Sequence, residues 1–289
     1  MALNIYNLPY DLAPGTINPD KSVIIRCYKA QHNTVRNKII LHQNMINLLI
    51  SGTKTITYPE GTVTVQEKEF LILSKGNCLT SEILPEHGLF SSILLYFSHE
   101  LLADFFIKYK SSLKGEEPTD QKPYLIFKQD PFILNYINSL DLLLQSGVAL
   151  SEEFNLLKLE ELLLYLLKLY PAKLRSLLIV AKDNEDMQLR KTVESNIGHT
   201  VTIEELAFLC NSSMSTFKRR FKRIYNTSPQ KWLLLRKLQF AAELLKHPDQ
   251  RPGIIYQKIG YENHSSFTQS FKQHYGMTPR QYQDLNVKP

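Results

Sequence analysis

Residues 210–229 read CNSSMSTFKRRFKRIYNTSP, and residues 260–279 read GYENHSSFTQSFKQHYGMTP. When the two segments are aligned 50 residues apart, identical or similar residues recur, and six of the pairs carry the comparison. The pairs are Phe217 and Phe267, Phe221 and Phe271, Lys222 and Lys272, Tyr225 and Tyr275, Ser228 and Thr278, and Pro229 and Pro279. A fixed internal period indicates that one supersecondary unit occurs twice.

The first copy predicts two helices joined by a tight turn. Thr202 and Glu205 have the spacing of a capping box, which opens a helix. Asn211 tolerates the left-handed backbone of a turn, and Ser213 can cap the second helix. An inward stripe at helical spacing follows, formed by Phe217, Phe221 and Ile224. A helix, a short turn and a second helix with a basic outer face make up a helix-turn-helix unit.

The second copy repeats this pattern, and a helix connects the two units. Ile255 and Ile259 face inward, and Gly260 supplies the turn. Ser228 and Pro229 start the connecting helix, which runs to about residue 246. Its apolar side carries Trp232, Leu235, Leu238, Ala242 and Leu245. A straight helix over this span is about 27 Å long, close to the roughly 34 Å of one DNA turn, so two reading helices can occupy successive major grooves.

The outer faces of the two second helices provide the candidate DNA contacts. In the first unit these are Ser215, Lys218, Arg219, Lys222 and Arg223. In the second unit they are His264, Ser265, Thr268, Gln269 and Lys272. Arg219 is the candidate guanine reader and Gln269 can pair with adenine, whereas Lys222 and Arg223 are expected to contact phosphates. The second set is nearly neutral, so its role stays open. These residues can read bases, contact only phosphates, or form a solvated surface.

The C-terminal pattern resembles the AraC/XylS family of transcription regulators. The resemblance covers roughly residues 187–285 and includes the ending from Gly260 to Pro279. Tyr256 departs from it, because the family has a small residue there that packs against the recognition helix. The resemblance implies a variable N-terminal domain, often a cupin-like β-barrel. The N-terminal half also resembles activators of type III secretion genes, in which a protein can be the controlling partner.

Charge is distributed unevenly along the chain. Residues 187–289 contain 16 Lys and Arg against 7 Asp and Glu, a net charge of +9, whereas residues 1–186 have a net charge of −3. A basic segment joined to a slightly acidic one indicates that only the C-terminal part meets a polyanion. The 43% hydrophobic and 21% charged content is typical of a globular chain. Double-stranded DNA is therefore the expected partner.

The N-terminal half predicts strands followed by helices. Consecutive antiparallel strands are expected at residues 23–28, 45–50, 53–58, 62–65, 70–73 and 93–97, with turns that include 75–77. Helices are expected at residues 98–110, 131–145 and 152–170. The fold class is α+β: a cupin-like barrel or sandwich with flanking helices over residues 1–181, then an all-α DNA-binding domain over residues 182–289. Residues 182–186 are the expected linker.

The helix at residues 152–170 has more apolar surface than one buried face needs. It carries Phe154, Leu156, Leu157, Leu159, Leu162, Leu163, Leu164, Leu166 and Leu167. Either the subunit core buries all of them, or part of the surface forms a dimer seam. Two ways of controlling the regulator through its N-terminal domain stay open. The enclosed β architecture favours a small apolar or sugar-like ligand inside the barrel, whereas the leucine-rich helix favours a partner protein together with self-association.

Nothing in the sequence predicts an enzyme, a cofactor or a metal site. His32, His42, His87 and His99 stand without a neighbouring ligand pattern. Phosphate-binding glycine loops and nucleophile elbows are missing as well. The three cysteines are scattered, and neither a secretion signal nor an apolar segment of membrane-spanning length is visible. A cytoplasmic location is expected.

These patterns together predict a sequence-specific transcription regulator, an activator by its resemblance. Its expected partners are DNA, RNA polymerase, a second copy of the chain, and a small-molecule effector or regulatory protein. The alternative is an architectural DNA-binding protein without sequence preference, for which the basic C-terminal part would suffice.

Overall fold

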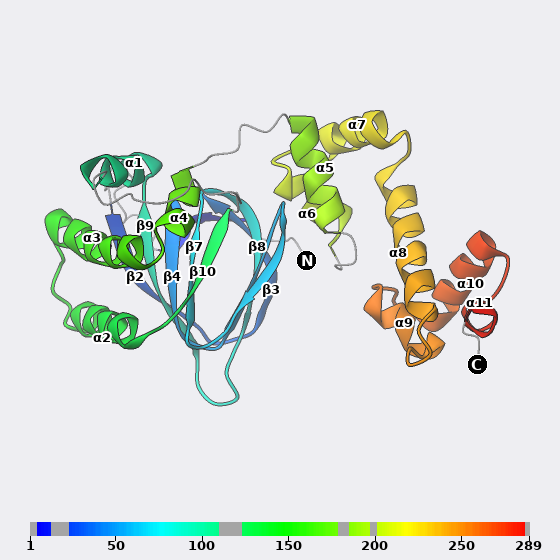
Figure 1. Cartoon of the computed structure of the whole chain (residues 1–289), viewed down its shortest axis with the longest axis horizontal. Helices are drawn as coiled ribbons and strands as arrows, with labels where there is room; N and C mark the ends of the chain where they lie inside the picture. Colours follow the sequence, from blue (N-terminus) through cyan, green and yellow to red (C-terminus); the bar gives the residue numbers. More distant parts are fainter. Residues whose placement is uncertain (1–4, 13–22, 110–122, 179–184, 197–200, 287–289) are drawn as a thin grey trace. The chain divides into compact units, whose positions relative to one another are not determined.

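The computed structural model describes residues 5–12, 23–109, 123–178, 185–196 and 201–286. The chain divides into two compact units, Met1–Asp183 and Asn184–Pro289. The described strands all belong to the first unit, and the described part of the second unit is helical (Figure 1). This arrangement confirms the expected fold class, a β-barrel or sandwich with helices followed by an all-α part.

Two five-stranded sheets face each other in the first unit. Their strands are β1 (Ile5–Leu8), β2 (Val23–Ala30), β3 (Thr34–Leu41), β4 (Asn44–Ser51), β5 (Thr53–Tyr58), β6 (Gly61–Val65), β7 (Glu69–Leu73), β8 (Gly76–Ile83), β9 (Phe90–Phe97) and β10 (Tyr124–Lys128). One sheet has the order β1-β3-β8-β5-β6 and the other β10-β7-β4-β9-β2. The six predicted strands are present, and β1, β3, β8 and β10 are additional.

The predicted antiparallel pairing is confirmed for all described strand pairs except β1 with β3, but the prediction that consecutive strands are partners was wrong. Among the described strands, only β5 and β6 are neighbours both in sequence and within a sheet, and β1 pairs with β3 in parallel. The turn expected at 75–77 is also displaced, because Gly76 already begins β8. Side-chain periodicity identifies a strand locally, but its partner is chosen by long-range burial of both sheet faces. The chain therefore crosses repeatedly between the two sheets.

Strand β4 shows why the second sheet is so apolar. Residues 44–49 are all buried, without the alternation of a half-exposed strand. Ile46 and Leu48 belong to a core on the helix-covered face, whereas Met45 and Leu49 belong to a core between the two sheets. A strand buried on both faces reads as a continuous apolar run. Polar Asn44 and Asn47 are the exceptions inside this run, and they are 4% and 0% exposed.

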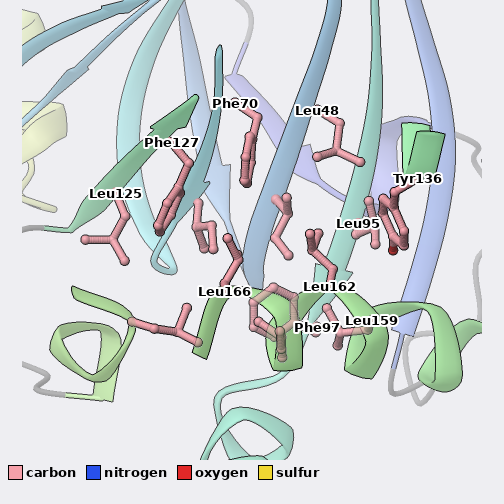
Figure 2. Close-up of a cluster of buried hydrophobic side chains, with 14 of the residues drawn as sticks. Leu48, Phe70, Leu95, Phe97, Leu125, Phe127, Tyr136, Leu159, Leu162 and Leu166 are labelled. Carbon is pink, nitrogen blue, oxygen red and sulfur yellow. The ribbon is translucent and has the colours of Figure 1, made fainter. Parts of the chain in front are cut away.

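Helices cover the outer face of the second sheet. They are α1 (His99–Lys108), α2 (Pro131–Gln145), α3 (Glu152–Leu169) and α4 (Pro171–Arg175), and short 3-10 turns occur at Tyr10–Leu12 and Ser176–Leu178. Figure 2 shows Leu159, Leu162 and Leu166 of α3 pointing toward the strands. Phe70 and Phe127 stack beside them with ring centroids 5.2 Å apart. This core fastens the helices to the sheet.

The leucine-rich helix α3 is divided between core and surface. The subunit core buries Leu159, Leu162, Leu163, Leu166 and Leu167. Leu157 and Leu164 remain 61% and 37% exposed. Most of the leucine density therefore reflects packing within the subunit, and only a narrow apolar strip is left on the surface. Within the described residues, no helix is both long and apolar enough to span a membrane.

The described part of the second unit is built from helices. These are α5 (Glu185–Ser195), α6 (Ile203–Leu209), α7 (Met214–Tyr225), α8 (Pro229–Leu245), α9 (Pro252–Lys258), α10 (His264–Tyr275) and α11 (Pro279–Asn286). The expected linker at 182–186 is partly wrong, because residues 185 and 186 belong to α5, while 182–184 lie outside the described residues. The buried side chains of α5, Leu189 and Val193, pack inward four residues apart.

Candidate nucleic-acid interface

Helices α6 and α7 form the first helix-turn-helix unit with the predicted local signals. The backbone N–H of Thr202 donates to Oε2 of Glu205 at 2.7 Å, and the N–H of Glu205 donates to Oγ1 of Thr202 at 3.2 Å. Asn211 has a φ of 49°, and the Ser213 hydroxyl accepts from the N–H of Thr216. The capping box, the left-handed turn and the serine cap are all confirmed.

Aromatic rings hold each recognition helix in the same way. In the first unit Phe221 lies 4.5 Å from Tyr225 and 5.7 Å edge-on from Trp232, measured between ring centroids. In the second unit, 50 residues later, Phe271 lies 4.6 Å from Tyr275 and 5.4 Å edge-on from Tyr282. Phe217 and Phe267 complete the two clusters with no exposed surface. The repeat in sequence is thus also a repeat in packing, and these phenylalanines are core residues.

The outer face of α7 gathers the first set of predicted contact residues. Its members are all exposed to solvent: Ser215, Lys218, Arg219, Lys222 and Arg223. Four of the five are cations on one short helix whose opposite face is anchored by the buried phenylalanines. A rigid helix with a basic outer face can enter the major groove and contact both bases and phosphates.

Sequence reasoning overlooked Arg220 and Asp186. Arg220 is 9% exposed, and its Nε donates to Oδ1 of Asp186 on α5 at 3.4 Å. Its Nη1 lies 3.5 Å from the hydroxyl of Ser212 in the turn. Helical spacing could have revealed the arginine, because Arg220 lies beside Phe221 and three residues after Phe217, on the inward side. A buried arginine requires an acidic partner, and this partner lies in the helix taken for a linker.

Arg223 has the same partner. Its Nη2 donates to both carboxylate oxygens of Asp186, at 2.7 Å each. The Arg223 side chain is 65% exposed, whereas that of Asp186 is 36% exposed. One predicted phosphate contact is therefore held by a carboxylate in this structure, at the margin of the basic face.

Helices α9 and α10 form the second helix-turn-helix unit. Ile255 and Ile259 are buried, and Gly260 has a φ of 70°, as the predicted turn requires. The side chain of Asn263 caps α10 by accepting from the N–H of Ser266 at 2.8 Å. Gly276 ends the helix in a left-handed conformation. The second copy uses different residues at its turn and caps, and its turn is one residue longer, because α9 ends at Lys258 and α10 begins at His264 whereas α6 ends at Leu209 and α7 begins at Met214.

The outer face of α10 is less uniform than that of α7. His264, Ser265, Gln269 and Lys272 are exposed. Thr268 is only partly exposed, and its hydroxyl oxygen is buried with no hydrogen-bond partner among the described residues. Four of the five predicted residues are thus accessible, while the Thr268 hydroxyl points into the protein.

Tyr256 packs at the interface between the helices of the second unit. Its ring meets that of His264 edge-on, with centroids 5.9 Å apart, and its hydroxyl accepts from Nε2 of Gln257 at 3.0 Å. The tyrosine also packs against the buried cluster of this unit. A large residue is therefore accommodated where the sequence resemblance implies a small one, and it contacts the first residue of the recognition helix.

Helix α8 connects the two units. It begins with the predicted cap, in which the Ser228 hydroxyl accepts from the N–H of Lys231 and Pro229 occupies the first turn. Its 17 residues correspond to about 25 Å. Lys237 on α8 donates from Nζ to the carbonyl oxygen of Gly260 at 3.2 Å, and burial lowers the pKa of its ammonium group. The connecting helix is therefore tied directly to the turn of the second unit.

The histidines considered as metal ligands do not gather. No group of three or more His, Cys, Asp or Glu side chains suited to a metal ion occurs in the described ranges. His42 instead contacts Asn7, with Nε2 and Oδ1 3.1 Å apart, and its ring lies 5.1 Å from that of Tyr10. Cys27, Cys78 and Cys210 are free thiols.

Comparison with known proteins assigns both halves of the chain. Residues 44–177 match the family model of the ExsA N-terminal regulatory domain, and residues 206–284 match that of a helix-turn-helix domain. The thermoregulatory protein LcrF of Yersinia pestis is 27% identical over 259 residues, which cover 84% of this chain and 90% of LcrF. The chain belongs to the AraC/XylS family of transcription regulators.

Further similarities accompany this AraC/XylS assignment. The HTH-type transcriptional regulator ExsA of Pseudomonas aeruginosa is 25% identical over 239 residues, which cover 81% of this chain and 84% of ExsA. The crystal structure of an apo ToxT variant from Vibrio cholerae aligns with 92% of this chain and 98% of that chain, at a TM-score of 0.40 and 14% identity.

The AraC/XylS regulator therefore has two parts with separate roles. An N-terminal regulatory domain precedes a DNA-binding part with two helix-turn-helix units. The expected function, a DNA-binding transcription regulator, is confirmed. The expectation that the chain is not an enzyme is confirmed as well, because the matched domains and relatives are those of transcription regulators.

Proposed function

We propose that this AraC/XylS regulator activates transcription by reading a two-part DNA site with α7 and α10. Each helix enters one of two successive major grooves on the same side of the duplex. Arg219 reads guanine in the first groove and Gln269 reads adenine in the second. Lys218, Lys222 and Lys272 bind phosphates and so set the register. Bound there, the regulator recruits RNA polymerase, as a transcription activator does.

The observation that carries this proposal is the solvent-exposed cationic face of α7, held on a buried aromatic cluster. Phe217 and Phe221 have no exposed surface, so the orientation of Arg219 is fixed by packing from behind. The net charge of +9 in residues 187–289 supports an electrostatic contribution to binding. Because the outer face of α10 is nearly neutral, it contributes more to the recognition of bases than to the strength of DNA binding. Because the regulator binds chromosomal DNA in this proposal, its location is the cytoplasm.

Selection of bound sequences from random DNA with the full-length chain tests this proposal. We expect a motif with two boxes, one degraded by Arg219→Ala and the other by Gln269→Ala. Lys231→Ala is a matched control, because Lys231 is exposed on α8 rather than on a recognition helix. A flat profile with affinity that depends only on salt would instead identify an architectural DNA-binding protein.

The barrel interior supports gating by a small molecule. A cavity of about 470 Å³ lies inside the first unit, within the size range of ligand sites. At its wall Lys54 and the hydroxyl of Tyr28 each donate to Glu82 at 2.8 Å. The charge of Lys54 is therefore already compensated by Glu82, although Arg26 and Lys29 also line the cavity. Next to the Lys54–Glu82 pair, an uncharged polar group fits better than a second carboxylate.

Buried polar atoms beside the cavity support the same proposal. Asn47, Ser92 and Tyr96 are completely buried, and their side-chain polar atoms have no hydrogen-bond partner among the described residues. These three residues do not line the cavity themselves, but Met45 and Leu94, which do, lie two residues from them on β4 and β9. Since unpaired buried polar groups destabilise a fold, this interior is suited to a sugar-like molecule that offers hydrogen bonds.

A thermal-shift screen of the full-length chain with neutral sugars, polyols and apolar compounds tests this gating. We expect a neutral polar compound to raise the melting temperature and Asn47→Leu to abolish the shift. If no compound class stabilises the wild type, control by a partner protein bound to the N-terminal domain replaces ligand gating.

We also propose that the regulator forms a homodimer through α2 and α3. These helices lie side by side, because the Tyr136 hydroxyl on α2 donates to the carbonyl oxygen of Lys158 on α3 at 2.6 Å. Exposed leucines remain on both helices: Leu134 and Leu142 on α2, and Leu157 and Leu164 on α3. A second copy would offer the same apolar strip, which makes an isologous contact self-complementary.

A further inference from the structure

Asp186 connects α5 to the recognition helix α7 at two points. Its carboxylate accepts from Nη2 of Arg223 at 2.7 Å to each oxygen, and from Nε of Arg220 at 3.4 Å. Arg220 and Arg223 are one turn apart on α7, and Asp186 lies in the first turn of α5. One carboxylate therefore bridges two arginines of the recognition helix from a helix outside both helix-turn-helix units.

The two arginines differ in exposure, and this difference gives Asp186 a defined position. The Arg220 side chain is 10% exposed and also reaches the Ser212 hydroxyl, so it is fixed between α5 and the turn. Because Arg220 anchors the carboxylate, Asp186 is held in place rather than following Arg223 as that side chain moves. Arg223 is 65% exposed and can leave toward solvent or a phosphate.

Arg223 borders the face that reads DNA. With 3.6 residues per turn, Arg223 lies about 40° around α7 from Arg219. Residues four apart on a helix are surface neighbours with Cβ atoms about 6 Å apart. The Asp186 carboxylate is therefore close to the phosphates that a docked α7 would approach. Among the described residues, Arg223 donates only through Nη2, and only to Asp186.

We propose that Asp186 is a specificity-determining positioning residue, which holds Arg223 beside Arg219 and offsets its charge until a correctly placed phosphate takes over the arginine. This inference rests on the proposed docking of α7 in the major groove. On random DNA the carboxylate competes with loosely placed phosphates, so nonspecific binding is weakened. At the correct site the phosphate lies within reach of the oriented guanidinium, and the exchange offsets the loss of the ion pair.

The test compares Asp186→Asn with Asp249→Asn in the full-length chain. Both substitutions remove one negative charge from the second unit, but Asp249 is exposed and its recorded bond is to neighbouring Gln250, not to α7. The readouts are the affinities for the selected site and for random DNA over a range of salt concentrations. Asparagine keeps a carbonyl oxygen that can accept from Arg220, but it removes the charge with which this buried arginine pairs, so the fold of the variant has to be checked.

We expect Asp186→Asn to tighten binding to random DNA about threefold at low salt, the size of one unscreened charge near a phosphate. The salt dependence should steepen by about 0.9 in log–log slope, as for one more phosphate contact. Affinity for the selected site should change less, so discrimination falls. Asp249→Asn should leave discrimination unchanged.

A double substitution separates positioning from a structural role. In an Arg223→Gln background, Asp186→Asn should no longer change discrimination, because the held cation is missing. Equal effects of Asp186→Asn and Asp249→Asn, or an effect that persists without Arg223, would overturn the proposal. A thermal melt of each variant identifies loss of fold, and Asp186→Glu, which keeps the charge, should restore discrimination in a folded protein. If the proposed function itself were wrong, the wild type would show no preference for any DNA site. That outcome is therefore distinguishable from failure of the role proposed for Asp186.

Discussion

The Nζ atom of Lys54 on β5 lies 2.8 Å from Oε1 of Glu82 on β8, and the two side chains are only 6% and 4% exposed. Tyr28 and Thr34 add hydrogen bonds to Oε2 of the same carboxylate. The pair therefore joins adjacent strands of the first sheet at the wall of the barrel cavity. Because both side chains are buried, each charge is stabilised by the other.

Removing one member of this pair should strongly destabilise the first unit. Glu82→Gln leaves the buried Lys54 ammonium without its counter-charge, for which we expect a loss of about 3–5 kcal/mol in the free energy of unfolding. Urea unfolding monitored by circular dichroism measures the loss. Glu86→Gln, at an exposed residue, is the matched control. A loss below about 1 kcal/mol would mean that the pair is hydrated rather than buried.

Acid should weaken the first unit through the same carboxyl group. Burial raises the pKa of Glu82, but the Lys54 ammonium and the hydrogen bonds from Lys54, Tyr28 and Thr34 outweigh burial, so the net pKa is lowered. A carboxyl whose pKa is lower in the folded state contributes stability above its unfolded pKa of about 4.3. That contribution is lost as the pH falls through the folded pKa.

Unfolding of the wild type and of Glu82→Gln between pH 3 and pH 7 (roughly the window set by carboxyl pKa values) measures this effect. The stability difference between the two should be largest near neutral pH and should shrink in acid. A difference that stays constant over this range would show that Glu82 titrates identically in the folded and unfolded chain.

Both recognition helices end at a residue with left-handed backbone, where glycine and asparagine should be tolerated better than alanine. Asn226 ends α7 with a φ of 53°, and Gly276 ends α10 with a φ of 75°. A Cβ atom at Gly276 would meet nothing within 4 Å, so substitution there costs only backbone strain. We expect Gly276→Ala to lower the unfolding free energy by about 1 kcal/mol and Gly276→Asn by less.

The complementary change at the first unit provides the comparison. Asn226→Gly should be neutral or slightly stabilising, whereas Asn226→Ala should cost about 1 kcal/mol. Thermal melts of the four single variants test both positions. If alanine and asparagine were equivalent at Gly276, left-handed strain would not govern these helix ends.

Self-association should depend on the exposed leucines of α2 and α3. We expect Leu157→Ser combined with Leu164→Ser to shift the full-length chain from dimer to monomer in analytical ultracentrifugation at micromolar concentration. The fold should survive, since both leucines are exposed. Leu285→Ser, at an exposed leucine of α11 in the other unit, is the control. A wild-type monomer, or a dimer unaffected by the double substitution, would contradict this interface.

Much of the DNA-binding half could be predicted from the sequence because its signals are local. Caps at Thr202 and Ser213, the turn at Asn211 and the inward phenylalanines act within one or two helical turns. The 50-residue period doubled each of these signals. The same period pairs Trp232 with Tyr282, and the structure adds that both make equivalent edge-on contacts, with Phe221 and Phe271 respectively.

The N-terminal half was less predictable. Strands β3 and β8 carry polar residues such as Asn37, Lys38 and Asn77, which obscure the alternation of a half-buried strand. Their partners lie far away in sequence, as in the pairing of Ile39 with Cys78. Strand pairing over such distances depends on how two sheets bury their shared faces, which no local window contains.

Local residue chemistry was therefore sufficient to identify two helix-turn-helix units, a basic outer face on α7 and the regulator they belong to. Long-range packing was needed to pair Asp186 with Arg220 and Arg223, to bury Lys54 against Glu82, and to cover most leucines of α3. The difference has one physical reason: caps and helical stripes act over a few residues, whereas ion pairs and sheet registers form between segments brought together only when the chain folds.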